Sequence, residues 1–424
     1  MAITTAPASE RHGTFSALRS VNFRIYFGGQ LVSLSGTWMQ NIAQGFLIFS
    51  LTRSEVMLGL VALAMGLPSV LLAPVSGVII ERFPRRQLLL VVVALQMVLA
   101  LVMTLLTATG LIQVWHIVVL AFLLGCVNAF DAPTRLSFVV EMVGKDDLQS
   151  GIALNSIMNS ATRVVGPTLA GLILVQFGVV LCFLLNAVSF LAVIVSLVVM
   201  KVPHARAPER STRPLAMLRE GFGYVRHDRD VAPLLMLAAI GGLLLVPLIQ
   251  ILPAFADVVL HSPKEGYAAL SAAQGFGSVM GGMAVGMFAA WLGRGRVIVL
   301  GALLASVTMI AMAVQTQVIP AAFFCMLTGI AMVTYFVNIN TQIQLTVPDA
   351  FRGRVSSLYT LTFIGMTPFG SMLLGMLAEG LGTPVALSLY GVVIALFAGL
   401  VLLRYPHVVR LGAAVPRVAE AAAD

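Results

Sequence analysis

Charged residues are scarce in this chain of 424 residues, of which only 10% are Asp, Glu, Lys or Arg. A soluble domain usually carries about 25%. Hydrophobic residues reach 59% and the mean hydropathy is +1.00, so too little polar surface remains to keep the chain in water. The composition therefore excludes a cytosolic enzyme, a disordered chain and a soluble nucleic-acid-binding protein.

Cysteine and catalytic motifs are also nearly absent. The three cysteines, Cys126, Cys182 and Cys325, lie inside apolar runs without CxxC spacing, which argues against a disulfide framework or a zinc site and favours small buried hydrophobes. There is no phosphate-binding loop of the GxxxxGK type and no HExxH or GxSxG motif, so this chain is not itself an ATP-driven pump. We expect no enzymatic activity, no cofactor and no metal ion.

Long apolar stretches are what the sequence has instead. A helix needs about 20 apolar residues to span a bilayer, and polar or Gly/Pro punctuation separates twelve such stretches. They cover residues 24–49, 57–80, 88–109, 115–130, 151–175, 180–200, 231–255, 267–291, 297–314, 319–341, 355–377 and 384–403. We therefore predict an all-α membrane protein with twelve transmembrane helices and no catalytic domain outside the membrane.

The positive charges mark one side of this membrane. About 22 of the 25 Lys and Arg residues fall in the tails and the even-numbered connections, where Lys and Arg stay cytoplasmic. Only Arg53 and Lys264 fall on the other side. We expect a multi-pass protein of the plasma (inner) membrane with both termini in the cytoplasm, inserted by its first helix because residues 1–20 have no signal-peptide core. The net charge of +8 then reflects topology and attraction to anionic lipid, and not nucleic acid.

Weak self-similarity indicates two six-helix halves. We expect the halves at residues 22–200 and 231–404, a cytoplasmic linker at 201–230 with a basic amphipathic stretch, and cytoplasmic tails at 1–21 and 405–424. A site between two such repeats is exposed to one side and then the other as the halves rock. The matches at shifts of about 209 and about 204 residues are 66–69 with 275–278, Gly77 with Gly286, Arg85 with Arg294, Gly166 with Gly370, and Gly171 with Gly375.

The connection after the second helix carries the most specific motif. It reads Gly77-Val-Ile-Ile-Glu81-Arg82-Phe-Pro84-Arg85-Arg86 and resembles the signature loop of the major facilitator superfamily. The resemblance implies a cytoplasmic latch that stabilises one access state, in which a carboxylate beside arginines forms a charge-assisted network. The sequence departs from the pattern at Glu81, which replaces the commoner Asp, and at Pro84, which replaces Gly. The alternative is that these charges only set the topology.

The fifth helix contains Gly166-Pro167 and Gly171 among small residues. This stretch resembles the antiporter motif of the same superfamily, in which small faces let helices approach closely. The resemblance implies export by exchange in place of uptake.

A polar face on the fifth helix ends in a deep arginine. Asn155, Asn159 and Arg163 recur every four residues and so share one face. Arg163 lies about 20 Å along the helix from Ser150, and a guanidinium at that depth costs at least about 2.5–3.5 kcal/mol. We expect Arg163 either to attract an anionic or polarised substrate group or to bond to helix carbonyls and neighbouring amides.

Two further helices carry polar stripes at helical spacing. By the family resemblance, helices one, four, seven and ten line a central cavity, where amides and hydroxyls would meet a substrate and Trp38 would add an apolar surface. The alternative for each residue is hydrogen bonding between helices. The residues of these stripes are Gln30, Thr37, Asn41 and Gln44 on the first helix and Tyr335, Asn338 and Gln342 on the tenth.

The fourth helix ends with Asn128, Asp131 and Arg135 on one face. Asp131 is expected to pair with Arg135 as a gate at the cytoplasmic mouth, or to titrate as a proton carrier if it is desolvated. The loop that contains Asp349, Arg352 and Arg354 occupies the corresponding place in the second half, as a gate or a topology element.

The region from Asn22 to Arg404 as a whole resembles the major facilitator superfamily. The opening Asn22-Phe-Arg-Ile-Tyr-Phe, Trp38 and the ending from Asp131 to Arg135 resemble the branch of enterobactin-type siderophore exporters and macrolide efflux pumps. We expect a monomeric secondary active exporter of a hydrophobic or amphiphilic small molecule, working by alternating access and exchange for protons or another ion, in contact with membrane lipid. The alternatives are a solute importer or lipid flippase, or a non-transporting membrane scaffold or sensor.

Overall fold

The computed structural model describes residues 15–144, 147–200 and 214–410, and in these ranges every regular element is a helix. The elements are η1 (Ser16–Arg19), α1 (Val21–Thr52), α2 (Glu55–Arg82), α3 (Arg85–Ala108), α4 (Val114–Val143), α5 (Leu148–Phe177), α6 (Val179–Val199), α7 (Pro214–His227), α8 (Val231–Leu244), α9 (Leu248–Ala254), η2 (Phe255–Val259), α10 (Glu265–Leu292), α11 (Arg294–Ala313), α12 (Val318–Thr346), α13 (Asp349–Leu381), α14 (Thr383–Arg404) and η3 (Pro406–Arg410).

Eleven segments in the described ranges are long and apolar enough to cross a membrane. One of them, Val231–Val259, combines α8, α9 and the π-helical turn η2. The long helix α1 is not among the eleven, since Gly, Ser and Gln residues interrupt its apolar sequence. Each of the twelve predicted spans overlaps α1 or one of these segments, so the predicted all-α membrane fold is confirmed.

Two predicted helix ends fall well inside the observed helices. Helix α4 continues to Val143, although we predicted an end at residue 130 before Pro133. Proline removes only one backbone donor, and the neighbouring Thr134 hydroxyl bonds to the Phe130 carbonyl within the continuing helix. Helix α13 begins at Asp349, before the predicted start at 355, so the loop expected to act as a gate is the first turn of a helix.

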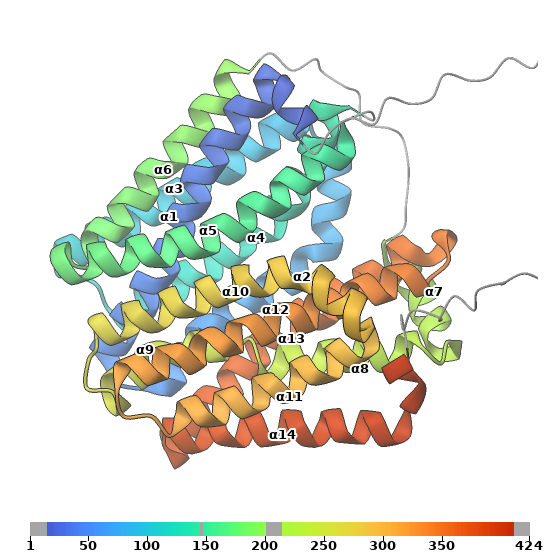
Figure 1. Cartoon of the computed structure of the whole chain (residues 1–424). Helices are drawn as coiled ribbons and strands as arrows, with labels where there is room; N and C mark the ends of the chain where they lie inside the picture. The colour runs from blue at the N-terminus through green and yellow to red at the C-terminus, as the bar shows by residue number, and fades with distance from the viewer. Residues whose placement is uncertain (1–14, 145–146, 201–213, 411–424) are drawn as a thin grey trace, which may run out of the picture.

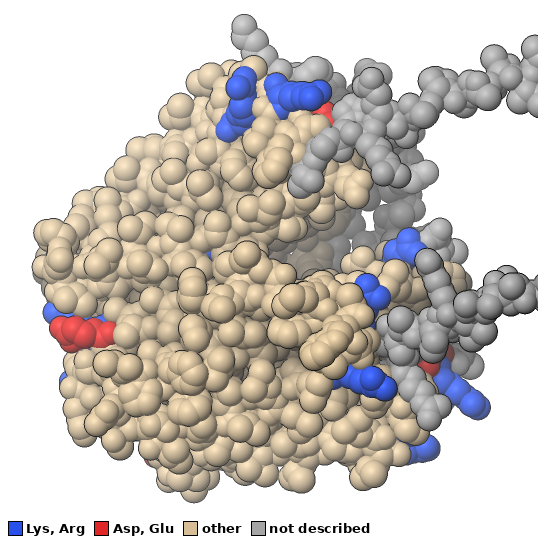
Figure 2. Space-filling view, in the orientation of Figure 1, with Lys and Arg blue, Asp and Glu red and all other residues tan. Residues whose placement is uncertain are grey.

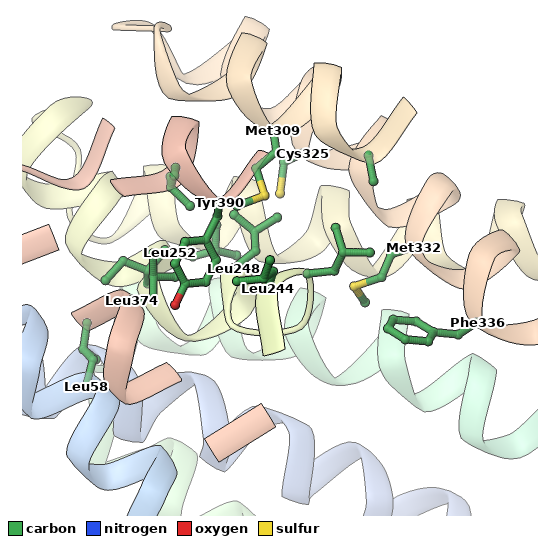
Figure 3. Packing of buried hydrophobic residues seen from close by; sticks show 14 of the residues in the cluster. Leu58, Leu244, Leu248, Leu252, Met309, Cys325, Met332, Phe336, Leu374 and Tyr390 are labelled. Carbon is green, nitrogen blue, oxygen red and sulfur yellow. The ribbon is translucent and has the colours of Figure 1, made fainter. Parts of the chain in front are cut away.

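The helices form two bundles that lie one above the other in Figure 1. In the N-half, α1–α6, helix α1 packs against α5 and α6, and α2 packs against α4. In the C-half, α8–α14, helix α12 packs against α10 and α11, and α8 against α13. The halves meet where α2 packs against α13 and α5 against α10. A buried apolar cluster joins them, and Figure 3 shows Leu58 of the N-half near Leu374 of the C-half.

The two ends of this interface differ. At one end, called here the closed end and defined by Arg53, Asp257 and Glu379, the helices touch directly. A Cβ added to Gly59 would lie 2.6 Å from the Ser371 carbonyl, and one added to Gly375 would meet the Glu55 carbonyl.

The other end, called here the basic end, is defined by Arg85, Arg86, Arg294 and Arg354. A Cβ added to Gly77 or Gly286 near this end would meet nothing within 4 Å. Figure 2 shows a hollow between the halves that opens toward the basic end. The interface is therefore closed at one end and parted at the other.

Helix α7 lies beside α13 at the basic end. The ring of Tyr224 stacks on Phe351 with centroids 4.8 Å apart, and Glu220 pairs with Arg354 at 3.0 Å. Tyr224 also donates a hydrogen bond of 2.7 Å to Asp228. The predicted amphipathic stretch thus forms a helix that is attached to the C-half. The rest of the predicted linker, residues 201–213, lies outside the described residues.

Candidate functional site

A cavity of about 960 Å³, which includes its open mouth, lies between the two halves. Helices α1, α2 and α5 supply one wall, and α9, α10 and α12 supply the other. The cavity therefore has the position expected of a site that both halves share. Its lining residues are Trp38, Asn41, Ile42, Gln44, Gly45, Ile48, Leu58, Val61, Ala62, Met65, Arg163, Pro167, Ile249, Gln250, Leu252, Tyr267, Ser271, Gln274, Ser278 and Met332.

Arg163 and Trp38 form the central feature of the N-half wall. The guanidinium carbon of Arg163 lies 5.6 Å from the centroid of the Trp38 ring, which is a cation–π distance. The Arg163 side chain is exposed to the cavity, and no hydrogen bond or ion pair to it exists within the part of the chain that the structure describes. The guanidinium is therefore held beside an aromatic ring while its donors stay available.

Close helix contacts fix this pair in place. A Cβ on Gly166 would collide with the Cβ of Trp38, so glycine at this position lets α5 lie directly on α1. A Cβ on Gly275 of α10 would meet the carbonyl of Arg163 itself. Farther along α5, a Cβ on Gly171 would lie 2.6 Å from Ala268 of the C-half. The small residues of the fifth helix thus set the position of Arg163 against both α1 and the C-half.

The remaining polar lining is neutral. Asn41 and Gln44 come from the predicted stripe on α1, next to Trp38. The C-half adds polar residues that our sequence analysis missed, namely Gln250, Tyr267, Ser271, Gln274 and Ser278. The sequence contains a signal for four of them. Residues 267, 271, 274 and 278 recur at the three- and four-residue spacing of one helix face, which indicates a polar stripe.

Other predicted cavity residues lie elsewhere. Tyr335 is buried and donates to the Leu237 carbonyl at 2.6 Å. Asn338 is also buried and donates to the Thr334 carbonyl at 2.8 Å, and Gln342 bonds to Thr346 at 3.1 Å. The polar stripe of the tenth span therefore faces the packed interior of the C-half, where each of the three side chains donates a hydrogen bond. The amide oxygens of Asn338 and Gln342 are buried and have no partner among the described residues.

Thr37, Asn155 and Asn159 were also predicted to line the cavity, but they are not among its lining residues. Thr37 donates to the Ser33 carbonyl on its own helix at 3.0 Å. Asn159 donates to the Asn155 carbonyl at 2.8 Å. Both asparagines lie on α5 between Arg163 and the start of the helix at the basic end.

A partly buried ionic group lies inside the N-half. The Arg135 Nε donates to Asp131 Oδ1 at 2.7 Å, and its Nη1 donates to the Oε1 of Gln30. The ring of Tyr26 packs on Phe138 beside this group. Asn128, one turn earlier on α4, accepts from Gln96 at 3.0 Å. The structure thus brings Asp131 and Arg135 together within one half, and Gln30 serves this pair instead of lining the cavity.

The signature loop also makes its contacts inside the N-half. Arg85 pairs with Glu141 of α4 at 3.1 Å, and the Nε of Arg86 donates to the Leu197 carbonyl of α6 at 2.7 Å. Arg82 is exposed, and the side chain of Glu81 lies outside the described residues. Glu141 was not among the predicted residues.

Ionic and polar contacts join the halves at the closed end. Arg53 pairs with Asp257. Glu379 accepts from the hydroxyl of Ser54 and from the Val56 N–H at 3.1 Å. These contacts bridge α1 and α2 of the N-half to η2 and α13 of the C-half.

In the part of the chain that the structure describes, no cluster of three or more His, Cys, Asp or Glu residues could hold a metal ion. The three cysteines are free thiols. Cys182 and Cys325 are buried, in agreement with the packing role expected from the sequence.

Comparison with known proteins places this architecture in a family. The sequence family of transmembrane secretion effectors matches residues 12–417. The chain is 21% identical to a staphyloferrin A transporter of Staphylococcus aureus over 87% of its length and 92% of the relative. It is 25% identical to an enterobactin exporter of Escherichia coli over 86% of each chain. A match to an uncharacterised MFS-type transporter of Bacillus subtilis, at 23% identity, spans only 55% of each chain.

Solved structures show the same fold. A POT family transporter in complex with 5-aminolevulinic acid superposes with a TM-score of 0.76 at 12% identity, covering 94% of this chain and 98% of the other. A bacterial homologue of the iron transporter ferroportin gives a TM-score of 0.67 at 18% identity, covering 90% and 99%. The chain therefore belongs to the transmembrane secretion effector family, multi-pass membrane transporters of the major facilitator superfamily.

Proposed function

We propose that this protein is a secondary active exporter of hydrophobic or amphiphilic small molecules that works by alternating access. The observation that carries the proposal is the shared cavity between the two halves. Contacts between the halves close the Arg53 end, and a hollow between them opens toward the basic end. A site between two repeats that is reachable from one side is the arrangement that rocking of the halves requires.

The orientation follows from charge. Lys and Arg in short connections stay on the cytoplasmic side, so we assign the basic end and both termini to the cytoplasm of a plasma (inner) membrane. In that orientation the cavity is open inward and ready to load substrate from the cytoplasm. An alkaline phosphatase fused after residue 404 should be inactive, and one inserted at residue 111 should be active. Activity in the first fusion would reverse the orientation.

Export in place of import is supported by two observations. The names of the relatives describe siderophore transport and export, and others describe macrolide and multidrug efflux. The small-residue face of α5 that resembles the antiporter motif packs on Trp38 and on the C-half.

Exchange for protons completes the proposal, with Asp131 as the carrier. Asp131 is a partly buried carboxylate within a membrane helix, and its partner Arg135 would be released when a proton neutralises it. The cycle would then couple proton entry to the rearrangement of the Gln30 and Arg135 contacts. A monomer suffices for this mechanism, because both cavity walls come from one chain.

Everted membrane vesicles test the function directly. Fluorescent dansyl amphiphiles of charge −1, 0 and +1 are added outside, and their accumulation is followed while respiration holds the lumen acidic. We expect accumulation of at least one probe in vesicles with this protein and none in vesicles without it, with loss of accumulation when a protonophore collapses both the pH gradient and the membrane potential. Accumulation of no probe would contradict export. Accumulation that survives the protonophore would replace the proton by another coupling ion.

A further inference from the structure

The cavity wall has a single charge. Among its lining residues only Arg163 is ionised at neutral pH, and every other polar lining side chain is an amide or a hydroxyl. No carboxylate whose side chain the structure describes lines the cavity. Within the N-half, Asp131 is already paired with Arg135. The electrostatic potential of the cavity is therefore positive.

Arg163 is not neutralised by its surroundings. A guanidinium has five N–H donors in a planar fork, and in the described ranges none of them bonds to protein. Across the residues that the structure describes, no hydrogen bond links Arg163 to the asparagines one and two turns away, and the side-chain amide of Asn159 donates to the Asn155 carbonyl. Among the described residues, the charge interacts with the face of Trp38, whose ring centroid lies 5.6 Å from the guanidinium carbon. Of the two roles expected for Arg163 from the sequence, bonding to helix carbonyls and amides is thus absent.

The surroundings of the charge are apolar and aromatic on one side. Trp38, Ile42 and Met65 line the N-half wall, and Met332 lines the C-half wall. A guanidinium binds a carboxylate or another planar acid through two parallel hydrogen bonds. A ligand that satisfies both features has one acidic group and an apolar body, and its acidic group would lie against Arg163 while its body lies against Trp38.

We propose that the substrates of this transporter are amphiphilic anions, bound by the pairing of their acidic group with Arg163 and by contact of their apolar body with Trp38. This inference rests on the proposed export function for its direction. It also adds a driving force: an inside-negative membrane potential favours outward movement of each negative charge by about 50-fold per 100 mV. One anion moving outward is equivalent to one positive charge moving inward. Its exchange for one proton would therefore transfer a net two positive charges inward in each cycle.

Matched probe pairs test the charge preference. Dansylglycine and its neutral amide share one fluorophore and differ in a carboxylate, and a second pair, 1-naphthylacetate and 1-naphthylacetamide, repeats the comparison by competition. Binding of the dansyl probes to the purified full-length protein is followed by energy transfer from Trp38, after Trp115 and Trp291 are replaced by phenylalanine. We expect each anion to bind about 10- to 100-fold more tightly than its amide, as a charge-assisted hydrogen bond provides.

Variants of Arg163 test whether this residue causes the preference for anions over amides. Arg163→Gln should reduce the ratio of anion affinity to amide affinity to about 1 and leave the affinity for the amide unchanged. Arg163→Lys should keep a ratio above that of Arg163→Gln, because it retains the charge but loses the planar fork. Arg296→Gln removes an exposed cation outside the cavity and should leave the ratio as in the parent. Trp38→Leu removes the energy-transfer donor, so its binding of dansylglycine and of the amide is followed by dansyl fluorescence anisotropy, and both affinities should fall alike.

Two outcomes would overturn the inference: equal binding of anion and amide by the parent in both pairs, or an undiminished ratio in Arg163→Gln. The fate of the export function is read separately in everted vesicles. If the neutral or cationic dansyl probe accumulates there and Arg163→Gln does not alter it, export stands and anion selectivity fails. If no probe of any charge accumulates, the proposed function fails.

Discussion

Arg53, at the end of α1, forms an ion pair with Asp257 in η2, so the last turn of the first helix is joined to the broken seventh span of the other half. Glu379 adds a second link by accepting from Ser54 and from the Val56 N–H. Both links lie where the halves are in contact, and both must break before the closed end can open. They therefore bias the equilibrium toward the conformation described.

Removal of the Arg53 pair should favour opening of the closed end. The Arg53 side chain is 64% exposed, and pairs of that kind contribute about 0.2–1 kcal/mol. We expect Asp257→Asn to raise the ratio of molecules in which the Arg53 end has opened to molecules in which it is closed by about 1.5- to 5-fold. The effect should be smaller at high salt because exposed charges are screened. Lys264→Gln removes a charge from the same end without breaking this pair and should have no such effect.

Distances between spin labels measure this shift. Labels at Leu111→Cys in the N-half and Val314→Cys in the C-half, in a chain whose native cysteines are replaced by alanine, report on the separation of the closed ends. Both positions are exposed. A longer-distance population should grow in Asp257→Asn and stay as in the parent in Lys264→Gln. Equal distributions in all three proteins would mean that the ion pair does not hold the halves together.

The close helix contacts make a second prediction about the same equilibrium. Gly59→Ala places a methyl group 2.6 Å from the Ser371 carbonyl, which the present packing of α2 on α13 cannot accommodate. Gly286→Ala adds the same methyl group where nothing lies within 4 Å. We expect Gly59→Ala to open the closed end in the spin-label experiment and to lower the initial rate of probe export by about 5- to 160-fold, which corresponds to a strain of about 1–3 kcal/mol. Gly286→Ala should behave as the parent, and equal rates for both variants would contradict the packing argument.

Proton coupling through Asp131 is tested against a second carboxylate on the same helix. Asp131 and Glu141 both lie on α4 and both pair with an arginine, so the two neutral variants remove the same kind of interaction. We expect Asp131→Asn to abolish export driven by an imposed pH gradient while binding of the probe by the purified protein remains. Glu141→Gln should keep its response to the pH gradient. If Asp131→Asn still responds to the gradient, another group carries the proton.

The sequence was sufficient for the fold because its signals are local. The length of each apolar stretch predicts a membrane span, and the positions of the basic loops distinguish the two ends of the molecule. Arg163 and Trp38 could also be singled out, since a cation at membrane depth and a helical polar stripe are both visible in the sequence. Their pairing depends on Gly166, whose missing side chain brings α5 onto α1.

Spacing alone could not distinguish a cavity face from a packed polar face. Asn338 recurs on a helical stripe as Asn41 does, yet Asn338 bonds to the Thr334 carbonyl of its own helix and is buried. A side chain that can bond to the preceding turn needs no cavity. Glu141 could not be predicted as the partner of Arg85 for a different reason. The two residues are 56 positions apart, and only the packing of the N-half helices brings them together.

The end of helix α7 gives a prediction about pH, because the pKa values of Tyr224 on this helix and of Asp228 directly after it are both shifted. Burial, followed by the hydrogen bond to Asp228, raises the pKa of Tyr224 to about 12. Burial alone would raise the pKa of Asp228, but hydrogen bonds from Tyr224 and from the N–H groups of Val231 and Asp230 lower it overall. Because the pKa of Tyr224 is raised, the neutral phenol contributes fully to the attachment of α7 below about pH 10, the ordinary tyrosine value. This contribution is lost as the pH rises from about 10 to about 12. The lowered carboxyl pKa means that its contribution is present above about pH 4 and is lost as the pH falls further.

A nitroxide at the exposed position 222, introduced as Phe222→Cys, reports on the attachment of α7 across this range. In the parent sequence the label should become more mobile as the pH rises from about 10 to about 12, because the ionised phenol can no longer donate to Asp228. In Tyr224→Phe the hydrogen bond is absent at every pH, so mobility should be higher at pH 8 and show no change in the same window. Glu220→Gln, which breaks only the pair with Arg354, should raise mobility at pH 8 but keep the transition between pH 10 and 12. A transition of the same size in Tyr224→Phe would show that another group controls the attachment of this helix.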